Sequence, residues 1–262
     1  MNRKFKGFFS LLLTLTIIMS NSTASAMANT DFSKSVTVNS QLNNNVMLIE
    51  QDLNNHGSSV EKGLGDFISL LEKEKKKATN TEDTSKLQSL IDTTNNLLTV
   101  YKNYKNDTNN SYYTSDVASS SSNPIYSVAI AAVITWFANN GYLLSAELLA
   151  HMDENTTNGA IYHPYFGTRV LSSPLYGQIM LSSDWHGTGE FTNTGTTIQK
   201  DLYYGIHNFY WKKEANVFTL HDIYDYALGD YDGMQEIAVN TMYLAQEAGE
   251  LVPFLDEIII RY

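Results

Sequence analysis

The chain contains no cysteine among its 262 residues. It therefore forms no disulfide bond, and it offers no cysteine for the lipid anchor of a bacterial lipoprotein. Proline is scarce, with four residues, and charged residues make up only 17% of the chain. A chain without disulfides must take its stability from a packed core, and 43% hydrophobic residues suffice for one large domain or two small ones.

Several motifs of enzymes and cofactor-binding proteins are also missing. The sequence has no Gly-rich phosphate loop, no G-x-S-x-G nucleophile motif and no H-x-x-x-H pair of metal ligands. Its 17 Lys and Arg against 28 Asp and Glu give a formal net charge of −11. A surface of this sign repels nucleic acid. We therefore expect no cofactor and no nucleic-acid partner.

The N-terminal residues show the three parts of a secretory signal peptide. Residues 3–6 include three basic side chains, residues 8–19 are mostly apolar, and residues 24–26 read Ala-Ser-Ala, a small-residue cleavage pattern. The apolar run is shorter than the about 20 residues of a membrane span. We predict a signal peptide over residues 1–26 and a secreted mature protein, with an uncleaved N-terminal anchor as the alternative. The abundance of Asn, Ser, Thr and Lys is typical of proteins secreted by Gram-positive bacteria.

Residues 27–104 are predicted to be a helical N-terminal region. Two stretches, which begin near Ser59 and Thr84, repeat apolar side chains at three- and four-residue steps, as amphipathic helices do. A short polar joint between them predicts an antiparallel helical hairpin. Residues 105–123 then lose this periodicity and include four consecutive Ser, which predicts an exposed linker and a domain boundary.

Residues 124–262 are predicted to form an α+β domain, so the fold class of the whole chain is α+β. The domain begins with an apolar helical hairpin that Asn-Asn-Gly interrupts. Residues 206–211 and 217–224 alternate apolar and polar side chains and predict a β-hairpin, and residues 253–262 predict a buried strand. These strands would form a small antiparallel sheet.

The apolar hairpin allows two interpretations. It is either the buried core of the C-terminal domain or an element that acts on a membrane after release by a protease, and each half alone is too short to span a bilayer. The side chains that a membrane-active element would use are Ile125, Val128, Ile130, Val133, Ile134, Trp136 and Phe137.

The densest acidic cluster, HDIYDYALGDYDG, lies between a predicted strand and a predicted helix, where turns present side chains to solvent. Its carboxylates have three interpretations. They are capping groups of a turn, a Ca²⁺ site that uses Asp230 and Asp232, or groups for acid/base chemistry. The candidates for acid/base chemistry are Asp222, Asp225, His207 and His221. The two histidines would face each other across the predicted β-hairpin.

In the order of its parts, the stretch from about residue 58 to 150 resembles the sporulation-delaying protein family of secreted bacterial toxins. The residues that carry the resemblance are FISLLEKEKKK, KLQSLIDTTNNLLTVYKNY, the polar linker and PIYSVAIAAVITWF. The resemblance implies that proteolysis releases the apolar hairpin, that the hairpin collapses the membrane potential of competing cells, and that an immunity protein protects the producer. The active peptide of that family carries a cysteine pair, which this chain lacks.

A second resemblance concerns four residues, Asp222-Ile223-Tyr224-Asp225. They are similar to the D-x-Y-D element of colicin M-type toxins, which hydrolyse the lipid-linked precursor of peptidoglycan. This resemblance implies that Asp225 is the acid/base group and that Asp222 has an ancillary role. The His-Arg pair that follows in that family has no counterpart in residues 228–232.

Three functions therefore follow from the sequence. The first is a toxin or bacteriocin-like antimicrobial protein that acts on the membrane of competing cells. The second is a secreted hydrolase that acts on the cell envelope through the acidic cluster. The third is a non-catalytic protein that binds a surface through its Tyr-rich C-terminal part.

Overall fold

The computed structural model describes residues 24–108, 124–228 and 233–262. Most of the predicted signal peptide, most of the predicted linker and the candidate Ca²⁺ ligands Asp230 and Asp232 lie outside these ranges.

The chain divides into two compact units, Met1–Val36 and Thr37–Tyr262. Helix α1 (Ala24–Asn55) begins in the first unit and continues into the second.

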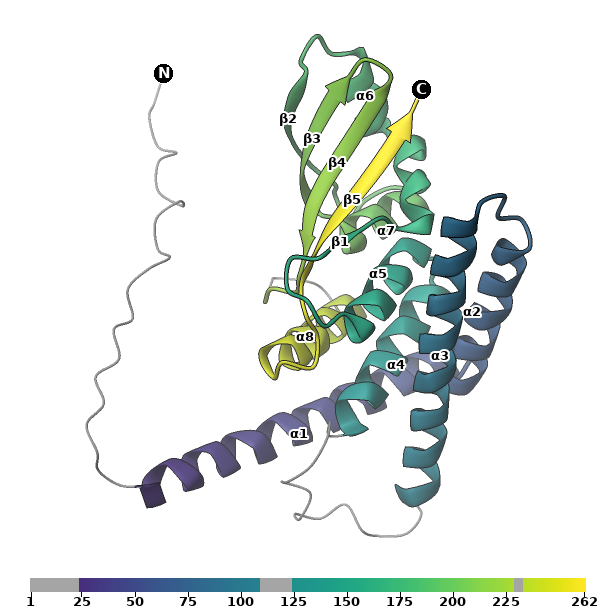
Figure 1. Cartoon of the computed structure of the whole chain (residues 1–262). Coiled ribbons are helices and arrows are strands. Elements are labelled where there is room, and N and C mark those ends of the chain that lie inside the picture. The colour runs from purple at the N-terminus through teal and green to yellow at the C-terminus, as the bar shows by residue number, and fades with distance from the viewer. Residues whose placement is uncertain (1–23, 109–123, 229–232) are drawn as a thin grey trace. The chain divides into compact units, whose positions relative to one another are not determined.

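The predicted N-terminal hairpin is confirmed as helices α2 (Val60–Lys75) and α3 (Thr81–Thr108), which pack against each other (Figure 1). The Ser59 hydroxyl accepts a hydrogen bond from the Lys62 backbone N–H and caps the start of α2. Helix α1 was not predicted at this length. In the second unit it buries four apolar side chains at three- and four-residue steps, Leu42, Val46, Ile49 and Leu53.

The predicted apolar hairpin is also confirmed, as helices α4 (Pro124–Asn139) and α5 (Leu143–Glu154). Between them Gly141 has a φ of +77°, a conformation that favours glycine. Helix α4 packs on α2, α3 and α8, and its burial places the hairpin in the core. Helices from both sides of residues 105–123 therefore belong to one compact unit, rather than to the two domains that the sequence suggested.

All the side chains predicted to be membrane-active are buried in this core. They are Ile125, Val128, Ile130, Val133, Ile134, Trp136 and Phe137. The Trp136 indole N–H donates to an Asp52 carboxylate oxygen at 3.1 Å, so even its polar atom is used inside the fold. Among the described residues, no helix combines the length and the apolar character that crossing a membrane requires.

The C-terminal half contributes a five-stranded mixed sheet, which confirms the α+β fold class. Its strands are β1 (Ile161–Tyr162), β2 (His186–Glu190), β3 (Asn208–Glu214), β4 (Val217–Tyr224) and β5 (Phe254–Arg261), in the order β1-β5-β4-β3-β2. Strand β1 runs parallel to β5, and the other neighbours are antiparallel. The predicted β-hairpin is β3–β4, although its turn lies later than expected, at Ala215 and Asn216.

One face of the sheet packs on helices and the other is open. Tyr176 of α6 (Pro174–Leu181) contacts Phe218 of β4 with its ring, and the turn of 3₁₀ helix η1 (Tyr165–Ser172) lies against Ile258 of β5. Alternation along β4 and β5 places Phe218, Leu220, Asp222, Tyr224, Phe254, Asp256, Ile258 and Ile260 on this helix-covered face. Tyr210, His221, Ile223, Glu257 and Ile259 lie on the open face.

A buried ion pair joins three of the helices. Asp201 of α7 (Thr197–Gly205) accepts hydrogen bonds from the Leu144 and Ser145 backbone N–H groups at 3.0 and 2.9 Å, at the start of α5. The Ser145 hydroxyl adds another at 2.8 Å, and the Arg169 guanidinium of η1 pairs with the same carboxylate. The negative charge therefore satisfies free N–H groups at the positive end of a helix.

Candidate functional site

A cavity of about 220 Å³ lies at the carboxyl end of β4. Its walls come from the segment that leads from α7 into β3, from the end of β4 and the residues after it, and from α8 (Met234–Glu247). The aromatic side chains in its lining are Tyr203, Tyr204, Tyr224 and Tyr226. The polar residues that line it are His207, Asn208, Asp222 and Asp225.

Hydrogen bonds hold the segment after β4 against α8. Gln246 accepts a hydrogen bond from the Tyr226 backbone N–H at 2.8 Å and donates one to the Tyr226 carbonyl oxygen at 3.1 Å. The Tyr224 and Tyr226 hydroxyl oxygens lie 2.6 Å apart. These hydrogen bonds therefore hold the part of the cavity wall that carries Asp225 in place.

An open groove of about 830 Å³ adjoins this cavity on the open face of the sheet. Thr188, Glu190, Tyr210, His221 and Leu255 are among the residues that line it. Cavity and groove share four residues, Asn208, Asp222, Ile223 and Asp225. The two hollows are thus neighbours along the end of β4.

The structure brings all four predicted acid/base residues to these two hollows. His207, Asp222 and Asp225 line the cavity, and His221 lines the groove with Asp222 and Asp225. The expected pairing of the two histidines was wrong, because the residue opposite His221 on β3 is Tyr210 and His207 precedes the strand. Each histidine instead lies near a glutamate: His207 Nε2 is 3.5 Å from Glu190 Oε1, and His221 Nδ1 is 3.3 Å from Glu257 Oε1.

His207 also has an unusual backbone. Its φ is +48°, in the left-handed region that residues other than glycine seldom adopt. The Phe191 N–H donates to the His207 carbonyl oxygen at 2.7 Å, and the His207 N–H donates to the Leu202 carbonyl oxygen at 3.2 Å. These bonds hold the strained residue in place at the cavity wall, and strain of this kind concentrates at functional sites.

Asp222 is the carboxyl group that the site perturbs most clearly. Its pKa is raised to about 9, mainly by burial and then by the Asp256 and Asp225 carboxylates, against the opposing effect of the Ile223 backbone N–H. Burial also raises the pKa of Asp225, which is more accessible. At neutral pH Asp222 therefore carries a proton while it lines a cavity, so it is able to donate a hydrogen bond or a proton.

Asp256 is the partner of Asp222 on the neighbouring strand. The two residues are opposite each other in the β4–β5 register, and both belong to the helix-covered face. Asp256 is fully buried, and neither of its carboxyl oxygens has a hydrogen-bond partner among the described residues. Burial, together with Glu147 and Glu257, raises the pKa of Asp256 well above its ordinary value, so this group is protonated as well.

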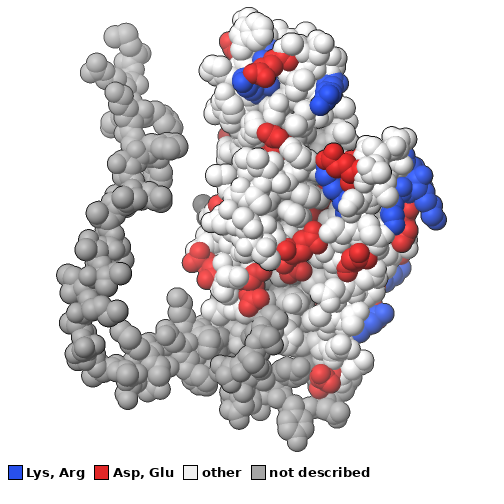
Figure 2. Space-filling view, in the orientation of Figure 1, with Lys and Arg blue, Asp and Glu red and all other residues white. Residues whose placement is uncertain are grey.

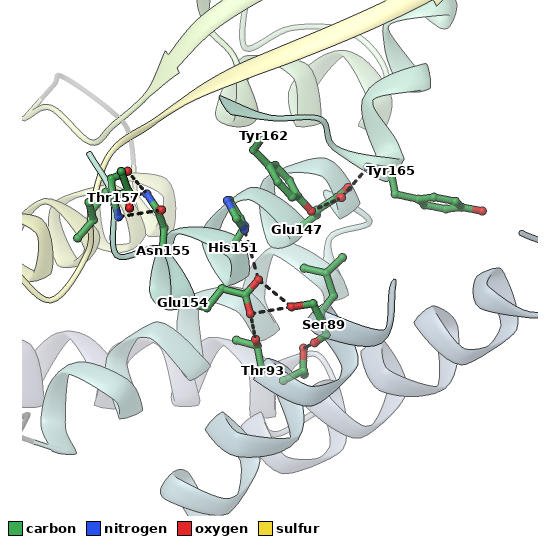
Figure 3. A network of polar contacts seen from close by, with 12 residues as sticks. Ser89, Thr93, Glu147, His151, Glu154, Asn155, Thr157, Tyr162 and Tyr165 are labelled. Atoms are coloured by element: carbon green, nitrogen blue, oxygen red, sulfur yellow. Dashed lines mark hydrogen bonds and ion pairs between the residues drawn. The ribbon is translucent and has the colours of Figure 1, made fainter. Parts of the chain in front are cut away.

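Behind Asp256 lies a second buried carboxyl group, Glu147 of α5 (Figure 3). It accepts hydrogen bonds from the Tyr162 hydroxyl at 2.8 Å and from the Tyr165 and Phe166 backbone N–H groups at 2.6 and 2.7 Å. Burial nevertheless raises its pKa to about 7. Tyr162 is opposite Asp256 in the β1–β5 register, so buried acidic groups extend from α5 to the cavity.

The same polar network continues from Tyr162 toward α3, as Figure 3 shows. The His151 ring stacks on the Tyr162 ring with centroids 3.7 Å apart, and His151 Nδ1 lies 3.3 Å from Glu154 Oε1. Glu154 in turn accepts hydrogen bonds from the Ser89 and Thr93 hydroxyl groups of α3. This part of the network joins helices and faces neither hollow.

Sequence reasoning missed Asp256 and assigned no role to Glu147. Both had a signal, since each is an acidic residue inside an otherwise apolar run, LVPFLDEIII for the first and YLLSAELLA for the second. A charged residue at a buried position of such a run requires a partner or a proton.

No site in the described ranges favours a metal ion. No group of three or more His, Cys, Asp or Glu among the described residues is arranged to hold one. The predicted Ca²⁺ ligands Asp230 and Asp232 lie outside those ranges.

Comparisons with protein-family models, with curated proteins and with solved structures found no match for this chain. The function is therefore inferred from the geometry of the site itself.

Proposed function

We propose that this protein is a secreted acid–base hydrolase that acts on cell-envelope material, with Asp222 as its proton donor. The observation that supports the proposal is a partly buried, protonated carboxyl group in the wall of a cavity that two other candidate residues, His207 and Asp225, also line. Catalytic acids need a pKa above that of an ordinary carboxyl group to hold their proton near neutral pH, and burial supplies this shift.

In the proposed reaction Asp222 gives its proton to the leaving oxygen atom as the bond to that atom breaks. Asp225 accepts a proton from the attacking water molecule, whose oxygen forms the new bond. Asp225 suits this role because it is exposed and lines both hollows. Exchange of a proton with solvent then returns both groups to their starting states.

The remaining side chains of the cavity suit a neutral ligand that bears hydroxyl groups. Tyrosine hydroxyl groups and the Asn208 amide both donate and accept hydrogen bonds. A bound hydroxyl group would therefore find partners of either kind at Tyr224, Tyr226 and Asn208.

The test is hydrolysis of isolated Gram-positive cell walls, measured as the release of new reducing ends. Asp222→Asn keeps the shape of the side chain but removes the proton donor, so we expect activity to fall by about 10² or more. The melting temperature should stay the same or rise, because the variant no longer buries an acidic group. Wild-type activity should also decline as the pH passes about 9, where Asp222 loses its proton.

Asp184→Asn is the matched control, because Asp184 is exposed and lines neither hollow. It should leave activity unchanged. Full activity in Asp222→Asn would show that Asp222 is not the donor, and unfolding of both Asp222→Asn and Asp225→Asn would show that these carboxyl groups are structural.

A further inference from the structure

A row of rings on the open face of the sheet leads into the groove beside the cavity, and Tyr210 and His221 of this row line the groove. Three rings, from His186 of β2, Tyr210 of β3 and His221 of β4, lie next to one another across the open face of the sheet. Adjacent ring centroids are 6.2 and 6.3 Å apart, and the interplanar angles are 28° and 32°. The rings are therefore nearly parallel but too far apart to cover each other, and we refer to these three residues as the ring strip.

The ring strip is accessible. His186 and Tyr210 are exposed, with 43% of Tyr210 accessible to solvent, and His221 is partly so. An exposed tyrosine of this kind on a regular strand gives a rigid, flat contact surface at low cost in conformational entropy. The spacing of the rings is comparable with the length of one sugar residue in a linear chain.

The charges around the ring strip are already paired. Glu257 lies between His221 and His163, with Glu257 Oε2 3.4 Å from His163 Nδ1, and Lys212 pairs with Glu214. Figure 2 shows that the surface over the strands carries few charged side chains. The groove therefore provides no excess positive charge for an anionic ligand, and the net charge of −11 opposes one.

The groove also leads to the proposed proton donor. Tyr210 and His221 line it, and Asp222 and Asp225 line both the groove and the cavity. A ligand that lies along the ring strip therefore reaches the proposed reacting groups at one end. A single small molecule bound in the cavity would not need the ring strip.

We propose that the groove binds a linear, uncharged polysaccharide whose sugar rings pack on the ring strip, with Tyr210 as the principal contact. This inference rests on the proposed hydrolase function and specifies its substrate class, a glycan chain cleaved at a glycosidic bond. The apolar C–H face of a sugar ring packs on an aromatic face, whose negative charge attracts it. Two carboxyl groups, one protonated, are the usual requirement for hydrolysis of that bond.

The test is calorimetric titration of the full chain carrying Asp222→Asn, so that binding is measured without cleavage. The probes are N-acetylglucosamine, its linear trimer and hexamer, and a linear glucose hexamer. We expect a hexamer to bind at least ten times more tightly than the monomer. Adding Tyr210→Ala should weaken hexamer binding about tenfold, as expected for the loss of one aromatic contact, while Tyr210→Phe should retain it.

Tyr262→Ala is the control, because Tyr262 is also exposed but lies outside the groove, and it should not change the affinity. Failure of both hexamers to bind, equal affinity for monomer and hexamer, or wild-type affinity in Tyr210→Ala would each overturn the inference. Tyr210-dependent binding by a protein that cleaves no cell wall would support glycan binding in the groove and contradict the hydrolase function. Cell-wall cleavage that is unchanged in Tyr210→Ala would support the hydrolase function and contradict the role of the groove.

Discussion

Asp222 and Asp256 are opposite each other on neighbouring strands, with both side chains on the helix-covered face of the sheet. Side chains in such a pair lie within contact distance. Two carboxylates cannot both be ionised at this separation when they are buried, so the pair holds protons well above the pH at which ordinary carboxyl groups lose them. The acidity of the proposed donor therefore depends first on its burial and then on its partner Asp256.

Asp256→Asn tests this relationship through the pH dependence of stability. In the folded protein the pKa values of Asp222 and Asp256 lie above the value of 3.8 for an unperturbed Asp, so the folded state binds more protons than the unfolded state as the pH rises from about 4 to about 9. The free energy of unfolding therefore decreases across this window. Asp256→Asn removes one of these groups, so its stability should decrease less steeply.

We expect the melting temperatures of Asp256→Asn and wild type to be similar at pH 4, and the variant to be the more stable protein at pH 8. The groups that interact electrostatically with Asp256 are Glu147 of α5, Tyr162 of β1, and Asp222 and Tyr224 of β4, while its chain neighbour Glu257 acts from the open face. Asp256→Asn also removes a carboxyl group that raises the pKa of Asp222, so activity should be lost at a lower pH. A difference in melting temperature that does not change with pH would contradict the pairing.

Arg169→Met should destabilise the protein by about 3–5 kcal/mol, because it leaves the Asp201 carboxylate buried without its cationic partner. Asp201 is fully buried, and methionine preserves much of the aliphatic part of the arginine side chain. Urea unfolding provides the measurement. Lys62→Met is the control, since its ion pair with Asp66 is exposed and should contribute about 1 kcal/mol or less. Similar losses of stability in the two variants would show that the buried ion pair contributes no more than the exposed one.

Membrane activity of the apolar hairpin stays a prediction, and the structure defines its test. The intact protein should not depolarise Gram-positive cells, because the side chains of α4 that would enter a bilayer are buried. Membrane potential is measured after addition of intact protein and of protein cleaved by a protease within residues 109–123. Depolarisation by the cleaved form alone would show that the hairpin can leave the core, and depolarisation by the intact form would contradict the burial of α4 in solution.

The sequence predicted the elements whose periodicity is strong and local. Helices α2 and α3 and the β3–β4 hairpin each bury one regular face, which is visible as a pattern in the chain, whereas α4 and α5 are buried on nearly all sides and are visible as apolar runs. Strand β2 could not be predicted in the same way, since its sequence HGTGE has almost no apolar side chain. The Trp211 and Phe209 rings occupy the space where a Cβ atom at Gly187 or Gly189 would lie. The strand thus depends on side chains of its neighbour.

The candidate site was predictable in its residues but not in its arrangement. Crowding of carboxylates indicated Asp222 and Asp225, and their histidine neighbours were correctly linked to the same region. The opposing residue Asp256 lies more than thirty positions further along the chain. Only the β4–β5 register brings it to Asp222, and register follows from side-chain packing that no local pattern encodes.

The position of β5 between β1 and β4 has a consequence for synthesis on the ribosome. The helices α2 to α5 contact near neighbours in the chain and are free to form early, whereas the sheet stays in two separate parts until residues 254–261 have emerged. Until then Asp222 has no opposing carboxyl group and remains an ordinary acid. The nascent chain therefore acquires its perturbed carboxyl pair only after residues 254–261 have emerged, when helices α2 to α5 have already been free to form.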